Sequence, residues 1–118
     1  EEDVFQRLDS YAPYCDAFLT DSRKDGYIGG SGEINDWDKV QEIIQVSPHP
    51  VWLAGGLNPE NVRDAIDKAR PYGVDVSTGV SRYRSDYLRK DVKDHNKIAN
   101  FIRNAKGDNQ LTNREENA

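Results

Sequence analysis

The sequence predicts an α/β protein in which short parallel strands alternate with amphipathic helices. Segments with helical spacing of apolar residues alternate along the chain with short apolar runs, and glycines follow two of these runs. The runs are too short and too apolar for an exposed antiparallel sheet. Alternation of this kind is typical of parallel strands joined by helical crossovers.

The first unit is a helix over residues 2–12 followed by a strand over residues 16–21. Four apolar side chains recur at helical spacing in the first segment: Val4, Phe5, Leu8 and Tyr11. Pro13 ends this helix, since proline cannot continue it. The strand ends at Asp21, and a glycine-rich loop follows from Gly26 to Gly32.

The second unit combines a helix after Asp36 with a strand over residues 51–54. Asp36 suits the N-cap, because its carboxylate can accept a hydrogen bond from a free N–H of the first turn. One stripe of this helix is apolar, and we expect it in the core: Trp37, Val40, Ile43 and Ile44. Pro48 and Pro50 close the helix, and Trp52 of the strand is also expected in the core.

The third unit begins at Asn58-Pro59, an N-cap followed by proline at the first helical position. Its helix stops before Pro71 and turns four side chains inward: Val62, Ala65, Ile66 and Ala69. A strand over residues 74–77 follows and leaves at Gly79. After a polar loop, a last helix carries three apolar residues: Ile98, Phe101 and Ile102.

Composition limits the chain to one domain with a small core. The 118 residues carry a net charge of −5, and 36% of them are apolar. The acidic balance argues against a nucleic-acid or membrane-surface partner. A single cysteine excludes an internal disulfide, and no apolar run approaches a membrane span, so we expect a cytoplasmic protein. Residues 107–118 are predicted to be a disordered tail.

Three parallel strands cannot close a barrel, and a complete (β/α)8 barrel needs about 200 residues or more. The chain is therefore predicted to be either a small open sheet or a piece of something larger. In barrel order the strand over residues 51–54 lies between the other two, which leaves two open edges. Four apolar residues would then be half-covered: Val51, Leu53, Val74 and Val76. We therefore expect self-association or a partner chain.

Residues suited to ligand chemistry lie where the predicted strands end. Asp21, Gly55-Gly56 and Ser77-Thr78-Gly79 share one face of a parallel sheet, and ligands bind at that face. Backbone N–H groups on two adjacent glycine turns suit a phosphate dianion. The alternative is that these glycines only permit tight turns with positive φ. Asp21 has an alternative too, because it could cap the following turn or pair with Arg23 or Lys24.

Three sequence segments are specific when their order and spacing are read together. They are DAFLTDS (residues 16–22) running on to GGSG (29–32) and Asp36-Trp37, then LAGGLNPENV (53–62), then GVDVSTGV (73–80). Lys93-Asp94, with Ile98 and Phe101-Ile102, comes later. Over about residues 14–105 the chain resembles the C-terminal part of phosphoribosylanthranilate isomerase, a (β/α)8 enzyme of tryptophan biosynthesis. Lys93-Asp94 is similar to the start of the family's last helix.

This resemblance implies that residues 1–106 form a partial TIM barrel, its last three units. It also implies the Amadori rearrangement of N-(5-phosphoribosyl)anthranilate. Asp21 would be the general acid that protonates the ribose ring oxygen, and partial burial at its strand end would help it to hold a proton near neutral pH. Asp75 would contact substrate hydroxyls; alternatively, it is an inward-facing carboxylate satisfied by backbone N–H groups. The phosphate-site residues would be Gly55, Gly56, Ser77, Thr78 and Gly79.

The sequence departs from the family at the general base. The family's base is a cysteine in a Lys-Ile-Cys-Gly type motif, and nothing here matches that motif. Cys15 precedes the first strand, about 20 Å from its functional end, so we expect it to be a small buried hydrophobe. Ser81 stands where the family usually has Glu, and the stretch 81–92 is longer than expected. His49 and His95 form no metal pair with Cys15, and we expect neither metal nor cofactor.

Three functions follow from these observations. The leading one is the C-terminal portion of an isomerase barrel, inactive alone, that contributes the phosphate site and the acid. The second is a non-catalytic phosphate-binding or scaffold domain derived from such a barrel. The third is a related barrel that acts on another sugar phosphate. The expected partners are phosphate or a phosphorylated sugar, with either a second copy or a complementary barrel segment.

Overall fold

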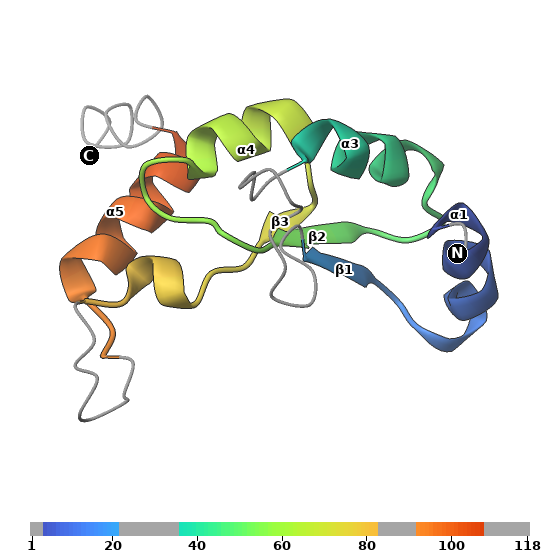
Figure 1. Cartoon of the computed structure of the whole chain (residues 1–118), viewed down its shortest axis with the longest axis horizontal. Coiled ribbons are helices and arrows are strands. Elements are labelled where there is room, and N and C mark those ends of the chain that lie inside the picture. The colour runs from blue at the N-terminus through green and yellow to red at the C-terminus, as the bar shows by residue number, and fades with distance from the viewer. Residues whose placement is uncertain (1–3, 22–35, 83–91, 108–118) are drawn as a thin grey trace, which may run out of the picture.

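The computed structural model describes residues 4–21, 36–82 and 92–107 (Figure 1). In chain order the elements are α1 (Val4–Tyr11), the 3-10 turn η1 (Ala12–Tyr14), β1 (Phe18–Asp21), α3 (Trp37–Val46), β2 (Val51–Ala54), α4 (Val62–Ala69), β3 (Gly73–Val74), the 3-10 turn η2 (Thr78–Val80) and α5 (His95–Lys106). The predicted glycine-rich loop, residues 83–91 of the polar loop and the predicted tail from residue 108 lie outside the described residues.

The strands form one parallel sheet in the order β1-β2-β3, which confirms the predicted α/β class and the central place of β2. Phe18 pairs with Val51 at the start of β1, and Asp21 pairs with Ala54 at its end. On the other side of β2, Leu53 pairs with Val74. Because the strands are parallel, their carboxyl ends meet at the same edge of the sheet.

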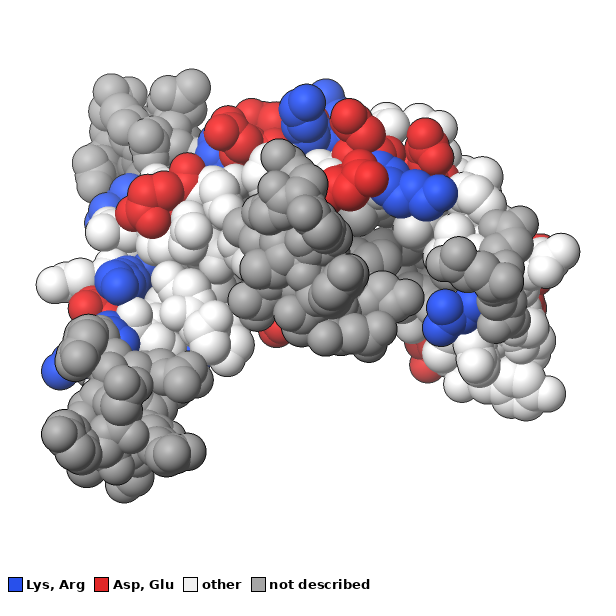
Figure 2. Space-filling view, in the orientation of Figure 1, with Lys and Arg blue, Asp and Glu red and all other residues white. Residues whose placement is uncertain are grey.

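Helices α3 and α4 lie along one side of the strands, and α5 continues the same arch (Figure 1). Side chains from these helices, from β2 and from the turns near it form a buried hydrophobic cluster: Val40, Leu53, Leu57, Val62, Ala65, Ala69, Val80 and Phe101. Trp37 packs against this cluster, as its place on the apolar stripe predicts. Figure 2 shows lysine, arginine and acidic side chains intermingled over α3 and α4, so this outer surface faces water.

The opposite face of the sheet is open among the described residues. Leu19 and Trp52, which pair in register, are 62% and 38% exposed. The Trp52 ring lies where a Cβ on Gly73 would have to stand, and it meets the Tyr72 ring edge-on with 5.7 Å between centroids. The expectation that Trp52 belongs to the core is therefore wrong, because side chains alternate across a strand and Trp52 points away from the helices.

The same alternation corrects the expected coverage of the central strand. Val51 and Leu53 were expected to be half-covered, but both are buried, with 2% and 0% of their surface exposed. The crossover helices lie on the side to which these two residues point, so that side is covered even without further strands. Val74 and Val76 are half-buried, as expected.

Two element boundaries differ from the prediction. Helix α4 begins at Val62, and not at Asn58-Pro59, because residues 59–61 first form a turn. The N-cap of α4 is Asn61 and not Asn58; the Asn58 side-chain oxygen instead accepts from the Asn61 N–H at 2.9 Å within the preceding turn. The first strand begins at Phe18 and not at residue 16.

The third strand is also shorter than predicted, since β3 ends at Val74. The Asp75 N–H still donates to the Leu53 carbonyl at 2.9 Å. Beyond that point β2 has already turned away at Gly55, which has a φ of 97°, so no strand in the described part of the chain pairs with the backbone of residues 76–77.

Helix α3 follows Asp36, the N-cap that was expected, and helix α5 follows Asp94, where the resemblance implied the start of the last helix. Asp36 accepts from the Lys39 N–H and Asp94 accepts from the Lys97 N–H, both at 3.1 Å. Cys15, expected to be buried, is half-buried, and its thiol donates to the Tyr11 carbonyl at 3.5 Å. Within the described ranges, no helix combines the length and apolarity that crossing a membrane requires.

Candidate functional site

A small pocket of about 100 Å³ opens at the carboxyl ends of the strands. Its lining comes from the ends of β1 and β2 and from the segment that joins β3 to η2: Asp21, Ala54, Gly55, Gly56, Leu57, Asp75, Val76, Ser77, Thr78 and Gly79. This set contains every residue that the sequence suggests for the site. The structure thus brings the predicted residues together, while the role of each stays a prediction.

The first wall of the pocket is the turn after β2. Gly55 and Gly56 have φ angles of 97° and 71°, a backbone region that favours glycine. The Asn61 side chain holds this turn with two hydrogen bonds. Its side-chain N–H donates to the Gly56 carbonyl at 3.0 Å, and its side-chain oxygen accepts from the Asn58 N–H at 2.8 Å. The turn is therefore held by hydrogen bonds and not only by glycine's freedom.

The second wall is the η2 turn. The Val80 N–H donates to the Ser77 carbonyl at 3.3 Å, and the Ser81 N–H donates to the Thr78 carbonyl at 3.0 Å. A Cβ on Gly79 would overlap with the Leu57 carbonyl, so the two turns touch backbone to backbone at this point. Gly79 is required by this close approach, which the sequence alone could not reveal.

Between the two walls are backbone donors suited to an anion. Among the described residues, nothing accepts a hydrogen bond from the N–H groups of Gly56, Thr78 or Gly79. Free N–H groups of successive turn residues form concavities that bind phosphate and similar groups. Because these residues line the pocket, their N–H groups are candidate donors to a small anion.

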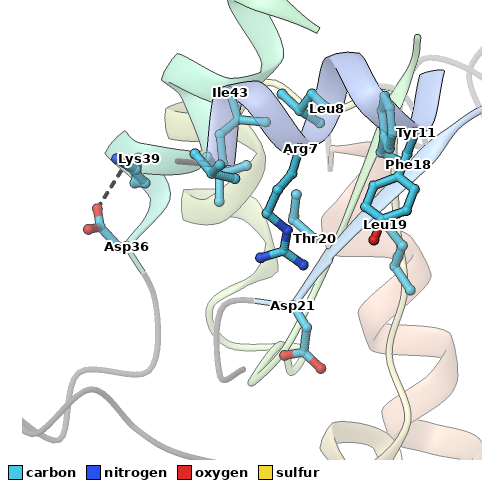
Figure 3. Close-up of a pocket in the computed structure, with 12 residues that line it drawn as sticks. Arg7, Leu8, Tyr11, Phe18, Leu19, Thr20, Asp21, Asp36, Lys39 and Ile43 are labelled. Atoms are coloured by element: carbon cyan, nitrogen blue, oxygen red, sulfur yellow. Dashed lines mark hydrogen bonds between the residues drawn. The ribbon is translucent and has the colours of Figure 1, made fainter. Parts of the chain in front are cut away.

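Asp21 is the last residue of β1 and stands beside the end of β2 through its register partner Ala54. Its side chain is exposed, so the partial burial expected from the sequence is absent in the described part of the chain. The alternative partners Arg23 and Lys24 lie outside the described residues. In Figure 3 the Arg7 side chain extends from α1 toward the end of β1 that carries Asp21.

Asp75 also reaches the pocket with an exposed side chain. In the described ranges no backbone N–H donates to its carboxylate, so the alternative of a carboxylate satisfied by the main chain is not found. Because Asp21 and Asp75 are both exposed, water screens their charges from an anion at the glycine turns. Within the described ranges the pocket lining thus combines two carboxylates with several main-chain N–H groups that have no acceptor.

A larger groove of about 450 Å³, which the sequence analysis missed, lies beside β1 (Figure 3). Helices α1 and α3 form its walls and the strand forms its floor, with mostly apolar lining: Val4, Leu8, Tyr11, Phe18, Leu19, Val40 and Ile43. The sequence signal for this groove was the apolar stripe of the first helix, because one strand of a few residues is too short to cover the whole stripe. Asp21 lies at the end of this groove and lines both cavities.

Fold and site together define a class: a parallel α/β protein whose candidate ligand site is built from the turns that follow its strands. Residues 3–104 match the family described as N-(5'phosphoribosyl)anthranilate (PRA) isomerase. The chain belongs to this family, which confirms the resemblance drawn from its motifs.

Individual relatives agree with this assignment. The chain is 46% identical over 99 residues to the N-(5'-phosphoribosyl)anthranilate isomerase of Methanopyrus kandleri, covering 84% of this chain and 43% of that protein. It is 38% identical over 99 residues to the enzyme of the same name from Haloarcula marismortui, covering 84% and 44%. The chain therefore spans less than half the length of these curated relatives.

Solved structures match in the same way. The phosphoribosyl anthranilate isomerase of Thermococcus kodakaraensis superposes with a TM-score of 0.61 at 33% identity, covering 88% of this chain and 46% of that one. The isomerase of Thermotoga maritima gives a TM-score of 0.55 at 33% identity, covering 91% and 58%. The parallel α/β arrangement of this chain is thus similar to part of these isomerase structures.

Proposed function

We propose that the chain is the C-terminal portion of a phosphoribosylanthranilate isomerase barrel and acts in the Amadori rearrangement of N-(5-phosphoribosyl)anthranilate. One observation carries the proposal: a single pocket collects an acid candidate and two glycine turns at the carboxyl ends of parallel strands. A structure of a relative in complex with reduced 1-(o-carboxyphenylamino)-1-deoxyribulose 5-phosphate, 33% identical to this chain, supports a phosphorylated ligand.

In this proposal the glycine turns bind the phosphate, and the two aspartates act on the sugar. The N–H groups of Gly56, Thr78 and Gly79 would hold the substrate phosphate without any side-chain charge. Asp21 would donate a proton to the ribose ring oxygen, which opens the sugar before the rearrangement. Asp75 would accept hydrogen bonds from the substrate hydroxyls.

The rearrangement also needs a base at the neighbouring carbon, and the described residues that line this pocket include no cysteine or histidine. Cys15 precedes β1, at the end of the strand away from Asp21. We therefore assign the base to the portion of the barrel that the relatives have beyond the matched region. The chain alone would bind the phosphate but would not turn the substrate over.

The groove and the open sheet face fit completion by further barrel units. Because a strand–helix–strand crossover is right-handed and places successive strands side by side, a strand that precedes α1 would lie next to β1, over the groove. Leu19 and Trp52, exposed on the open face, would then point into a barrel interior. We therefore propose that the chain is a partial barrel, and that its complement supplies a parallel apolar strand with its neighbouring units.

Complementation tests the proposal directly. The chain is mixed with the N-terminal portion of the Methanopyrus kandleri relative, and isomerase turnover is measured for each part and for the mixture. We expect turnover only in the mixture. Full activity of the chain alone would show that a base has been overlooked, and an inactive mixture with a demonstrated complex would favour the non-catalytic phosphate-binding domain.

A further inference from the structure

The η2 turn of the phosphate pocket is held from outside by a lysine. The Lys93 ammonium donates to the Ser77 carbonyl at 2.7 Å and to the Ser81 hydroxyl at 3.1 Å, with the Ser77 hydroxyl at 3.4 Å. Ser81 is the one polar residue buried in the described core, at 7% exposure. Lys93 thus spans both ends of the turn.

Short backbone pairing brings Lys93 to this place. Ser81 and Lys93 form an isolated antiparallel bridge, flanked by hydrogen bonds from the Arg82 N–H to the Val92 carbonyl and from the Asp94 N–H to the Val80 carbonyl, both 2.8 Å long. The following residue, Asp94, caps α5. The Asp94 carboxylate thus caps α5, the Asp94 N–H bonds the start of that helix to the turn at the Val80 carbonyl, and the Lys93 ammonium bonds the turn at Ser77 and Ser81.

The Lys93 ammonium binds the carbonyl of the Ser77–Thr78 peptide, and the N–H of this peptide is a candidate donor to an anion. Ser77 and Thr78 share one planar trans peptide, so the Ser77 carbonyl and the Thr78 N–H point in opposite directions. An ammonium that holds the Ser77 carbonyl therefore also fixes the direction of the Thr78 N–H, and Thr78 lines the pocket. A charged donor also polarises the peptide and makes its N–H a better donor.

We infer that Lys93 is a positioning residue for the anion pocket: its ammonium orients the Ser77–Thr78 peptide so that the free N–H group of Thr78 faces the bound phosphate. The inference rests on the proposed phosphate site. Lys93 acts through the backbone and makes no contact with the substrate. The described residues that line the pocket include no lysine or arginine. Lys93, which is outside this lining, places a positive charge on the turn itself.

The test compares Lys93→Met, Lys93→Arg and the control Lys68→Met. Lys68 is an exposed residue of α4, so its variant loses the same charge away from the turn. Two quantities are measured on the full chain: the dissociation constant for inorganic phosphate from amide NMR shifts, and the hydrogen exchange rates of the Val80 and Ser81 amides without phosphate.

For Lys93→Met we expect phosphate binding weakened by about tenfold or more, the effect of one charge-assisted hydrogen bond, with faster exchange at Val80 and Ser81 and unchanged global unfolding. Lys93→Arg should recover most of the binding, and Lys68→Met should bind as the parent chain does. Unchanged binding in Lys93→Met, or an equal loss in Lys68→Met, overturns the inference.

The exchange measurement separates this inference from the phosphate site itself. If the parent chain shows no phosphate-dependent shifts at the pocket amides, the proposed site is wrong, and with it the ligand-binding part of the inference. Faster exchange in Lys93→Met would still establish that the lysine holds the turn. Exchange rates equal to those of the parent chain would show that Lys93 does not hold the turn at all.

Discussion

Gly79→Ala is predicted to push the two walls of the pocket apart. The added Cβ meets the Leu57 carbonyl and the Asn58 Cα, which are backbone atoms and not the movable end of a side chain. Overpacking of this kind costs about 1–3 kcal/mol, and the smaller unfolded-state entropy of alanine offsets only about 0.4–1 kcal/mol of it. We therefore expect a net loss of about 1–2 kcal/mol in the free energy of unfolding.

Gly73→Ala is the matched control, because its Cβ would also meet an obstacle. That obstacle is the Trp52 ring, a side chain 38% exposed that can swing toward solvent. Urea unfolding gives the stability of both variants, and amide NMR titration with phosphate gives their binding. Gly79→Ala should lose both stability and phosphate binding, whereas Gly73→Ala should keep the binding. A Gly79→Ala chain that binds phosphate as the parent chain does would refute the backbone contact as the feature that shapes the pocket.

Three further predictions follow from the structure. Gly56→Val should abolish phosphate-induced shifts at the pocket amides, because φ is 71° at this position and valine avoids that region; shifts that persist there would contradict it. The hydrogen bond from the Lys97 N–H holds the pKa of Asp94 below its usual value, so the α5 cap is intact above about pH 4 and is lost as pH falls through the lowered pKa. Loss of the cap at low pH should therefore make the amides at the start of α5 exchange faster, and Asp94→Asn should remove this pH dependence. Leu19→Lys should leave the free energy of unfolding within about 0.5 kcal/mol of the parent chain's, since Leu19 is 62% exposed. The same variant should associate more weakly with a barrel complement in sedimentation. Association equal to that of the parent chain would argue against a barrel interior at this face.

Local sequence signals predicted the elements well where one interaction decides them. The aspartate cap at Asp36 and the apolar stripe of α3 are local features, and the structure has them where the patterns indicated. The order of the strands was predicted from barrel order, and the structure has that order. Strand length was predicted less well: β3 ends early because its partner β2 turns at Gly55, a fact about another segment.

The site was predicted as a set of residues but not as a geometry. Strand-end logic brought Asp21, Asp75 and both glycine turns to one pocket, since parallel strands end on one side. The contact between Gly79 and the Leu57 carbonyl and the grip of Lys93 on Ser77 depend on tertiary packing, which no spacing in the sequence encodes. The exposure of Asp21 likewise depends on which neighbouring units cover the end of β1.

The most direct test of the central claim is the rate of Asp21→Asn in the complemented barrel, measured with the parent mixture and an Asp16→Asn control, an exposed aspartate ahead of β1. A positioned proton donor contributes about 10²–10⁴-fold, so Asp21→Asn should lower turnover by at least about 10²-fold while the dissociation constant for phosphate stays unchanged. Asp16→Asn should have the parent rate. Turnover of the Asp21→Asn barrel equal to that of the parent mixture would contradict the assignment and leave Asp21 as a residue of the strand end without a catalytic role.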